Sequence, residues 1–86
     1  MKTSVEQLQA FLAVAETRHI TRAAERLGVS QSTLSTTLQK LEIRLGTKLF
    51  DRSTRGCFLS KAGMALRPSL ARLSQDWSQL VVKARE

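Results

Sequence analysis

Residues 21–46 constrain the fold more than any other part of this 86-residue sequence. Gly28 divides the stretch into two amphipathic segments, because glycine readily adopts the left-handed conformation that ends a helix. Ser30 can cap the helix that follows, and Gly46 can end it. In that second segment leucines recur at spacings of four, three and four, which predicts one apolar stripe along a helix. These leucines are Leu34, Leu38, Leu41 and Leu45.

The first segment is expected to be a short helix beginning at Thr21, whose hydroxyl can accept a hydrogen bond from a free backbone amide. Ala23, Ala24 and Leu27 give this helix a small face that can pack closely. Two helices joined by a short turn, the second with a polar face, form the helix-turn-helix pattern.

The face of the second helix opposite the leucines is polar but uncharged. Such side chains can donate and accept hydrogen bonds at base edges in a major groove without repulsion from phosphates. A face that serves only solubility more often carries Glu and Lys, although a solvated helical hairpin is the simpler alternative. The side chains on this face are Ser32, Thr36 and Gln39, with Gln31 and Ser35 on its flank.

The composition of the whole chain favours a polyanionic partner. Lys and Arg number 14 against 7 Asp and Glu, and the formal net charge is +7. This balance suits nucleic acid or an anionic membrane surface. Apolar runs fall short of the roughly 20 residues that span a bilayer, and the N-terminus lacks a signal-peptide pattern. With one cysteine no internal disulfide can form, so we expect a protein of the reducing cytoplasm.

Enzymes are the function class that the sequence argues against most strongly. Catalysis needs converging acids, bases, nucleophiles or metal ligands, and one histidine, one cysteine and seven scattered carboxylates form no such cluster. A chain of this length makes one small domain with a modest core. We therefore expect no catalytic residue, metal or cofactor in this chain. His19 is interpreted as an ordinary turn residue, and Cys57 as a small buried hydrophobe rather than a redox sensor.

Residues 5–17 are predicted to form an N-terminal helix. Thr3 with Glu6, or Ser4 with Gln7, has the spacing of a capping box at its start. Its buried face is expected to consist of Val5, Leu8, Phe11, Leu12 and Ala15.

Two short apolar runs after Gly46, separated by turn-forming residues, predict a β-hairpin. The runs are Leu49–Phe50 and Cys57–Leu59. We expect Arg52 and Arg55 at the tip of this hairpin, followed by Lys61. An arginine on a thin wing can enter the minor groove of DNA. The alternative is that both arginines are solvated or pair with Asp51, and for Arg52 an intramolecular partner is an equal alternative.

Ser60 can cap a long final helix over residues 61–85. Its apolar residues step alternately by four and three, the period of a coiled-coil seam. So narrow a stripe on so long a helix needs a second chain to cover it, and we expect Trp77 to anchor a homodimer. Pro68 predicts a kink near Leu66 or an irregular early turn, with dimer contacts mainly beyond it. The expected interface residues are Leu66, Leu70, Leu73, Trp77, Leu80, Val81 and Ala84.

Together these elements predict a mainly α protein. Three helices and a short β-hairpin wing would form a winged helix-turn-helix, followed by a long dimerisation linker helix. Residues 1–60 are expected to be the DNA-binding head, and residues 61–86 the linker helix.

One ordered set of residues carries a family resemblance: Leu8-x-x-Phe11, Ala15, Thr21-x-Ala23-Ala24-x-x-Leu27, Ser30-Gln31, Ser35, Leu41-Glu42-x-x-Leu45-Gly46, Leu49-Phe50-x-Arg52, Arg55 and Leu59-Ser60-x-Ala62-Gly63. In this order, without a gap, the set resembles the N-terminal DNA-binding domain of LysR-type transcriptional regulators. The resemblance implies a bacterial transcription factor whose linker helices pair antiparallel in a dimer. It also implies a tetrameric full-length protein with an effector-binding domain, for a small-molecule effector, that is absent from this chain.

The resemblance also implies roles for individual side chains. Gln31 resembles the family's base-reading residue at the start of the recognition helix, and Ser35 its phosphate or base contact. Arg55 resembles the wing arginine of the minor groove, and Thr21 a phosphate contact.

Three positions of the second helix depart from the family's common pattern. Ser32 stands where a proline is frequent, Thr33 where a small apolar residue is frequent, and Thr36 where an arginine is frequent. Ser32 and Thr36 can still make short or water-mediated contacts. The site preference is therefore expected to differ from that of better-matched relatives.

The expected target is a double-stranded DNA site that is interrupted and partly palindromic, with a spacing set by the paired linker helices. The alternatives are a helix-pairing protein-interaction module and a nonspecific binder of DNA or of membrane surfaces; a membrane-surface helix would need a wider apolar face. The expected DNA-binding residues are Thr21, Gln31, Ser32, Thr33, Ser35, Thr36, Gln39, Arg52, Arg55 and Lys61.

Overall fold

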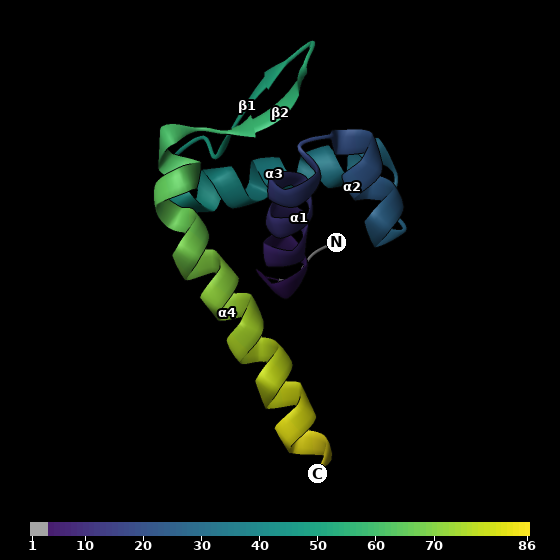
Figure 1. Cartoon of the computed structure of the whole chain (residues 1–86), viewed down its shortest axis with the longest axis vertical. Coiled ribbons are helices and arrows are strands. Elements are labelled where there is room, and N and C mark those ends of the chain that lie inside the picture. The colour runs from purple at the N-terminus through teal and green to yellow at the C-terminus, as the bar shows by residue number, and fades with distance from the viewer. Residues whose placement is uncertain (1–3) are drawn as a thin grey trace.

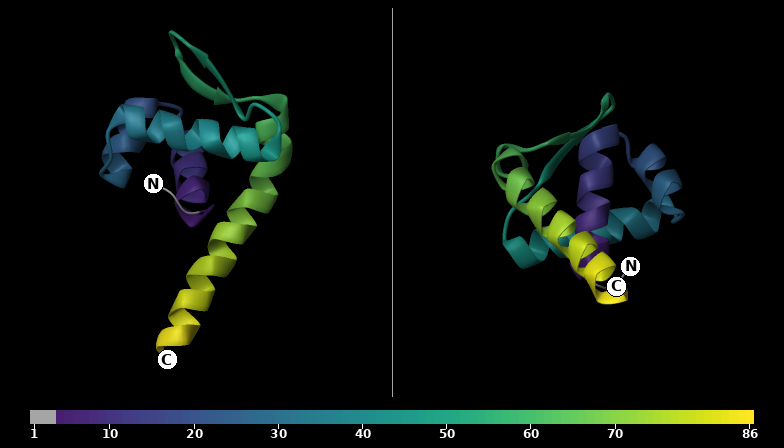
Figure 2. Two further views of the ribbon diagram at one scale, coloured as in Figure 1. Left: turned by 180° about the vertical axis from the view of Figure 1, so that it is seen from behind. Right: turned by 60° about the horizontal axis from the view of Figure 1, so that its bottom comes forward.

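The computed structural model describes residues 4–86, whose elements form a helical head with two projections. The hairpin and the last helix both leave the head near the C-terminal end of α3 and point in different directions (Figures 1 and 2). The predicted winged helix-turn-helix with a long final helix is confirmed for this part of the chain. The elements in order are α1 (Ser4–Thr17), α2 (Ile20–Leu27), α3 (Gln31–Leu45), β1 (Phe50–Ser53), β2 (Gly56–Leu59) and α4 (Lys61–Arg85).

Helix α1 is the centre of the core, because it contacts α2, α3, α4 and β2. Phe11 and Val14 are fully buried, and the ring of Phe11 lies 5.3 Å from that of Phe50, centroid to centroid. The predicted burial of Phe11 and Ala15 is confirmed, whereas Val5, Leu8 and Leu12 are only half-buried.

Within residues 4–86, every helix is too short or too polar to cross a lipid bilayer.

The start of α1 is linked to α3 by Arg44. Arg44 donates hydrogen bonds to Ser4 Oγ at 3.0 Å and to Gln7 Oε1 at 2.9 Å. Ser4 is the first residue of the helix and Gln7 is buried, so the predicted box of these two residues is wrong. Thr3, of the other predicted box, lies outside the described residues.

The turn between α1 and α2 corrects the prediction that Thr21 caps α2. The helix begins one residue earlier, and its N-cap is His19, whose side chain accepts from the backbone N–H of Arg22 at 3.4 Å. The sequence favoured Thr21 because of its residue type, but the left-handed Arg18 (φ 57°) redirects the chain and brings His19 to the cap. Thr21 therefore lies in the first turn of α2.

Helix α3 begins and ends as predicted. Ser30 Oγ accepts from the N–H of Thr33 at 3.1 Å, and the left-handed Gly46 (φ 70°) terminates the helix. Three of the four leucines of the predicted stripe are buried, but Leu45 is 43% exposed. The stripe therefore meets the core over only its first three positions.

The predicted hairpin is present, with Phe50 paired to Leu59 and Ser53 to Gly56 across antiparallel strands. Its base is buried, since Leu49, Phe50 and Cys57 all belong to the core. Glu42, on α3, accepts from the backbone N–H of Leu49 at 2.7 Å and so fixes the entry to β1.

Helix α4 runs as one uninterrupted α-helix through Pro68, so the irregular early turn predicted there is wrong, and the alternative, a kink near Leu66, stays a prediction. Ser60 caps it, as predicted, by accepting from the N–H of Gly63 at 3.0 Å. Leu66 and Leu70 pack against the core of the head. Both were also expected in the dimer seam. Leu70 is buried against the head, so little of its side chain is left for a second chain, whereas Leu66 is half-buried and its place in the seam stays a prediction.

Candidate nucleic-acid interface

The exposed face of α3 carries the polar side chains expected to read DNA. Gln31, Ser32, Thr36 and Gln39 are exposed, and Ser35 is half-buried beside them. They are exposed because the leucines of the opposite face turn that side of the helix to the core. The resulting surface holds hydroxyls and amides, which suit hydrogen bonding to base edges.

Two threonines of α3 are engaged by their own helix. Thr37 is buried, and its hydroxyl donates to the carbonyl of Thr33 at 2.8 Å. Thr33 is half-buried, and its hydroxyl oxygen lies 2.9 Å from the capping hydroxyl of Ser30. The structure therefore places Thr33 within the N-terminal cap of α3, beside the exposed face rather than on it.

Gln31 is oriented by α2. Its Nε2 group donates to Oγ1 of Thr21, across the turn of the helix-turn-helix. Thr21 and Gln31, which were predicted separately as DNA contacts, are thus neighbours at one end of α3.

The two arginines of the wing occupy different positions. Arg55 lies in the two-residue turn between the strands, is exposed, and donates its backbone N–H to Ser53 Oγ at 3.2 Å. Arg52 was expected at the tip as well, and this was wrong: it lies within β1 opposite Cys57. Its side chain donates to Ser35 Oγ on α3 at 3.3 Å, and it lies on the same face of β1 as the buried Phe50, two residues earlier.

A groove of about 270 Å³ separates the wing from the start of α2. Its lining carries the side chains of His19, Arg52 and Arg55, together with the first turn of α2. Free backbone N–H groups and cationic side chains both favour an anion such as a DNA phosphate.

Cys57 lines this groove and is itself buried. Burial raises the pKa of its thiol, and the nearby Arg52 only partly opposes that effect. A neutral, buried thiol is a packing residue, as predicted, and not a reactive one.

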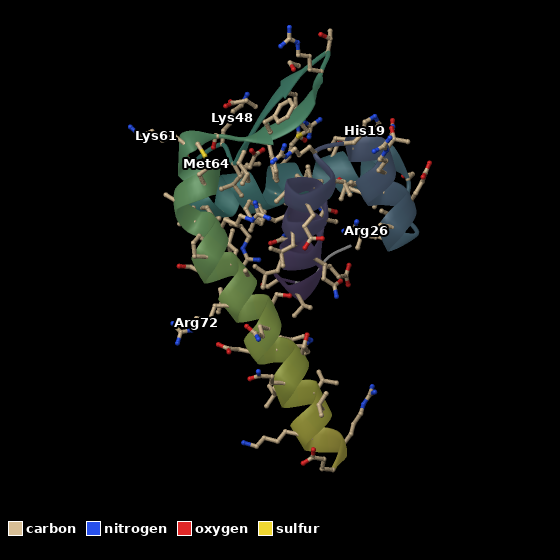
Figure 3. All side chains as sticks on the ribbon, in the orientation of Figure 1. His19, Arg26, Lys48, Lys61, Met64 and Arg72 are labelled. Atoms are coloured by element: carbon tan, nitrogen blue, oxygen red, sulfur yellow. The ribbon has the colours of Figure 1, made fainter. Side chains whose placement is uncertain are left out.

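The remaining cationic side chain of the prediction, Lys61, is at the start of α4. Lys61 and Lys48 point outward from the same corner of the head, whereas His19 lies near α2 (Figure 3). Lys48 was not among the predicted contacts, since nothing in the sequence brings it close to Lys61. The role of the Arg18 carbonyl, which accepts from Cys57 N–H at 3.0 Å and so positions the wing, has no signal in the sequence either.

Beyond the head, α4 exposes a row of large apolar side chains. Leu73 is 54% exposed, Trp77 46% and Leu80 56%. Val81 is half-buried and Ala84 exposed on the same helix. These five residues of the predicted seam are accessible on the single chain.

Known proteins resemble this chain both in sequence and in structure. The model of the family described as "Bacterial regulatory helix-turn-helix protein, lysR family" matches residues 5–64. The HTH-type transcriptional regulator ShiR of Corynebacterium glutamicum is 52% identical over 64 residues, 74% of this chain and 22% of that protein. XapR of Escherichia coli is 46% identical over 85 residues, 99% of this chain and 29% of that protein. The chain thus spans less than a third of either relative.

Among solved structures, the complex of the CbnR DNA-binding domain with DNA matches with a TM-score of 0.89 and 36% sequence identity. The match covers 96% of this chain and 95% of that one. Its extent includes the head, the wing and α4. The chain therefore belongs to the LysR family of bacterial regulatory helix-turn-helix proteins, and it carries the DNA-binding winged-helix domain of that family.

Proposed function

We propose that the chain binds double-stranded DNA sequence-specifically as a homodimer and is the DNA-binding part of a bacterial transcription regulator. The observation that carries this proposal is the exposed, uncharged polar face of α3 beside a basic wing. The complex of the CbnR domain with DNA supports it, because that domain matches this chain over nearly its whole length.

In the proposed complex α3 enters the major groove with its N-terminal end leading. Gln31, supported by Thr21, reads one base, and Ser35 makes the next contact. The other exposed polar side chains of the helix, Ser32, Thr36 and Gln39, line the same groove. Thr33 acts through the cap of α3, where the hydroxyl of Ser30 already engages it.

The wing and the helix termini supply most of the salt-sensitive affinity. Arg55 enters the adjacent minor groove, whose narrow parts attract cationic side chains. Lys61 and the first turn of α2 hold phosphates on either side. These contacts fix the register of the head on the duplex.

The exposed part of α4 pairs with the same helix of a second chain. Leu73, Trp77 and Leu80 form the centre of this contact, with Val81 and Ala84 beside them. The pairing sets the distance between two heads, so the target is an interrupted, partly palindromic duplex. The full-length regulator would be a tetramer in the bacterial cytoplasm and would answer to a small-molecule effector outside this chain.

An in vitro selection from a random duplex library, at near-physiological salt and with this chain, tests the proposal. We expect enrichment of a motif with two half-sites at a fixed spacing. Recovery of bound DNA without any motif would contradict specific readout and leave only nonspecific binding to phosphates.

Variants of α3 then test the assignment of the reading face. Gln31→Ala and Ser35→Ala are each expected to weaken binding to the selected duplex about tenfold, the loss of one base-edge contact. Gln9→Ala changes the same residue type at an exposed position of α1 and serves as the control. Unchanged affinity of both α3 variants would overturn the assignment.

A further inference from the structure

Arg52 connects the two elements that are expected to touch DNA. It lies on β1, yet its guanidinium donates to Ser35 Oγ on α3 at 3.3 Å. Arg55, three residues later, lies in the turn of the wing, away from this contact. The two arginines of the wing therefore do not have interchangeable positions.

The start of β2 is fixed independently of Arg52. Cys57, opposite Arg52 in the register, donates its backbone N–H to the carbonyl of Arg18 at 3.0 Å. Gly56 approaches the same carbonyl so closely that a Cβ atom there would lie 2.6 Å from the oxygen. Because β1 pairs with β2, the strand that carries Arg52 is held against the turn between α1 and α2.

The contact determines how the hydroxyl of Ser35 can be used. A guanidinium has only donors, whereas a serine hydroxyl has one donor and two acceptor lone pairs. Because Arg52 donates to it, Ser35 Oγ is the acceptor, and its proton is left for another partner. Thr37 donates its hydroxyl proton to the Thr33 carbonyl of the same helix at 2.8 Å, but among the described residues the partner of Ser35 is Arg52.

We propose that Arg52 and Ser35 act as a pair that selects guanine: Arg52 orients the Ser35 hydroxyl and also offers an N–H of its own to the base. The Ser35 proton and a remaining N–H of Arg52 are two adjacent donors. Guanine is the base that presents two adjacent acceptors, N7 and O6, in the major groove, whereas adenine presents an acceptor and a donor. This inference rests on the proposed entry of α3 into the major groove, and it adds the base and the residue that orients the contact.

The test replaces single guanines of the selected duplex with 7-deazaguanine, which removes the N7 acceptor and preserves base pairing. With the unaltered protein, replacement of one particular guanine in each half-site is expected to lower the affinity for the duplex about tenfold. Ser35→Ala should bind both duplexes equally. Arg52→Lys retains the charge but loses the planar fork, so it should lose most of this discrimination while the salt dependence of binding stays unchanged.

Arg55→Gln is the matched control on the same hairpin. It should weaken binding overall and keep the full response to 7-deazaguanine. The effects of Arg52→Lys and Ser35→Ala should be strongly non-additive, whereas those of Arg55→Gln and Ser35→Ala should add. Thermal melting of each variant confirms that it is folded.

Three results would overturn the inference: a selected site without guanine, discrimination that persists in Ser35→Ala, or additive effects of the Arg52 and Ser35 changes. In each of these cases, weaker DNA binding by the Gln31→Ala variant would still support the proposed function. A selection that recovers no motif would instead remove the proposed function itself, and this inference with it.

Discussion

At the scale of single residues, two backbone carbonyls position the projections of the head. The Arg18 carbonyl accepts from Cys57 N–H at 3.0 Å, and the Leu49 carbonyl accepts from Ser60 N–H at 2.8 Å. A glycine packs against each of them, Gly56 beside the first and Gly63 beside the second. These glycines permit backbones to approach where any side chain would collide.

Gly63→Ala tests the second of these contacts. In an exposed helix alanine is about 1 kcal/mol more favourable than glycine, but here the added Cβ would overlap the Leu49 carbonyl. We expect a net destabilisation of about 1–3 kcal/mol, as in other overpacked sites, measured by urea unfolding. Ala65→Gly, at an exposed position of the same helix, measures how much helix propensity alone changes the free energy of unfolding. A stabilised Gly63→Ala variant would contradict the close packing.

At His19, the N-cap of α2, a single substitution should change the stability of the protein and its binding to DNA in opposite directions. His19→Asp should stabilise the protein by about 0.5–1 kcal/mol, because aspartate is a favoured cap and complements the positive end of the helix. The same change should weaken binding to DNA, since it places a negative charge in the groove beside the wing. Urea unfolding and a duplex titration measure the two effects. Equal or lower stability would count against His19 as the cap.

At the scale of elements, α4 has two parts with different partners. Its first turns belong to the head: Gly63 and Leu70 are buried, and Leu66 packs on the core. Its later turns expose Leu73, Trp77 and Leu80. Helix period alone could not distinguish the parts, because the same apolar spacing continues through both.

Substitutions in the two parts of α4 should have different consequences. Leu70→Ala should lower the free energy of unfolding by about 2–5 kcal/mol, because it leaves a cavity in the core. Trp77→Ala should weaken the dimer by about 2 kcal/mol or more, as expected for an aromatic anchor, and leave the head folded. Sedimentation over a range of concentrations measures the dimer, and circular dichroism the fold. Unchanged association of Trp77→Ala would place the interface elsewhere.

At the scale of the whole molecule, excess positive charge and an elongated shape act together. The chain carries a net charge of +7 and extends over 46 × 27 × 20 Å. The far end of α4 projects well beyond the head (Figure 1). A second chain paired along it would therefore keep the two heads apart, each free to meet its own half-site.

The salt dependence of binding tests this electrostatic view. The logarithm of the affinity should fall linearly with the logarithm of the salt concentration. Arg55→Gln should reduce the slope by about 0.9, the value for one phosphate charge neutralised on duplex DNA, because a cation in the minor groove also displaces counterions. Arg72→Gln removes an exposed charge on α4 that points away from the head (Figure 3), and its slope should equal that of the unaltered chain. A slope that does not change in Arg55→Gln would mean that the wing does not approach the DNA.

The helices, the hairpin and the polar face of α3 could be predicted from the sequence, because each depends on local rules. Leucine spacing marks the buried side of α3, and Gly28, Gly46, Ser30 and Ser60 mark helix ends through their own conformational and hydrogen-bonding preferences. The burial of Cys57 followed equally from its residue type. The division into residues 1–60 and 61–86 stays a prediction.

The tertiary structure alone decided how these elements meet. It moved Arg52 from the tip of the wing to Ser35, and it packed Leu70 into the core with Leu66 against it. The left-handed Arg18 made His19 rather than Thr21 the cap of α2. The local sequence determines which residues can cap a helix, form a turn or be buried. The partner of a side chain depends instead on contacts between residues far apart in the chain. Those contacts form only when the core packs.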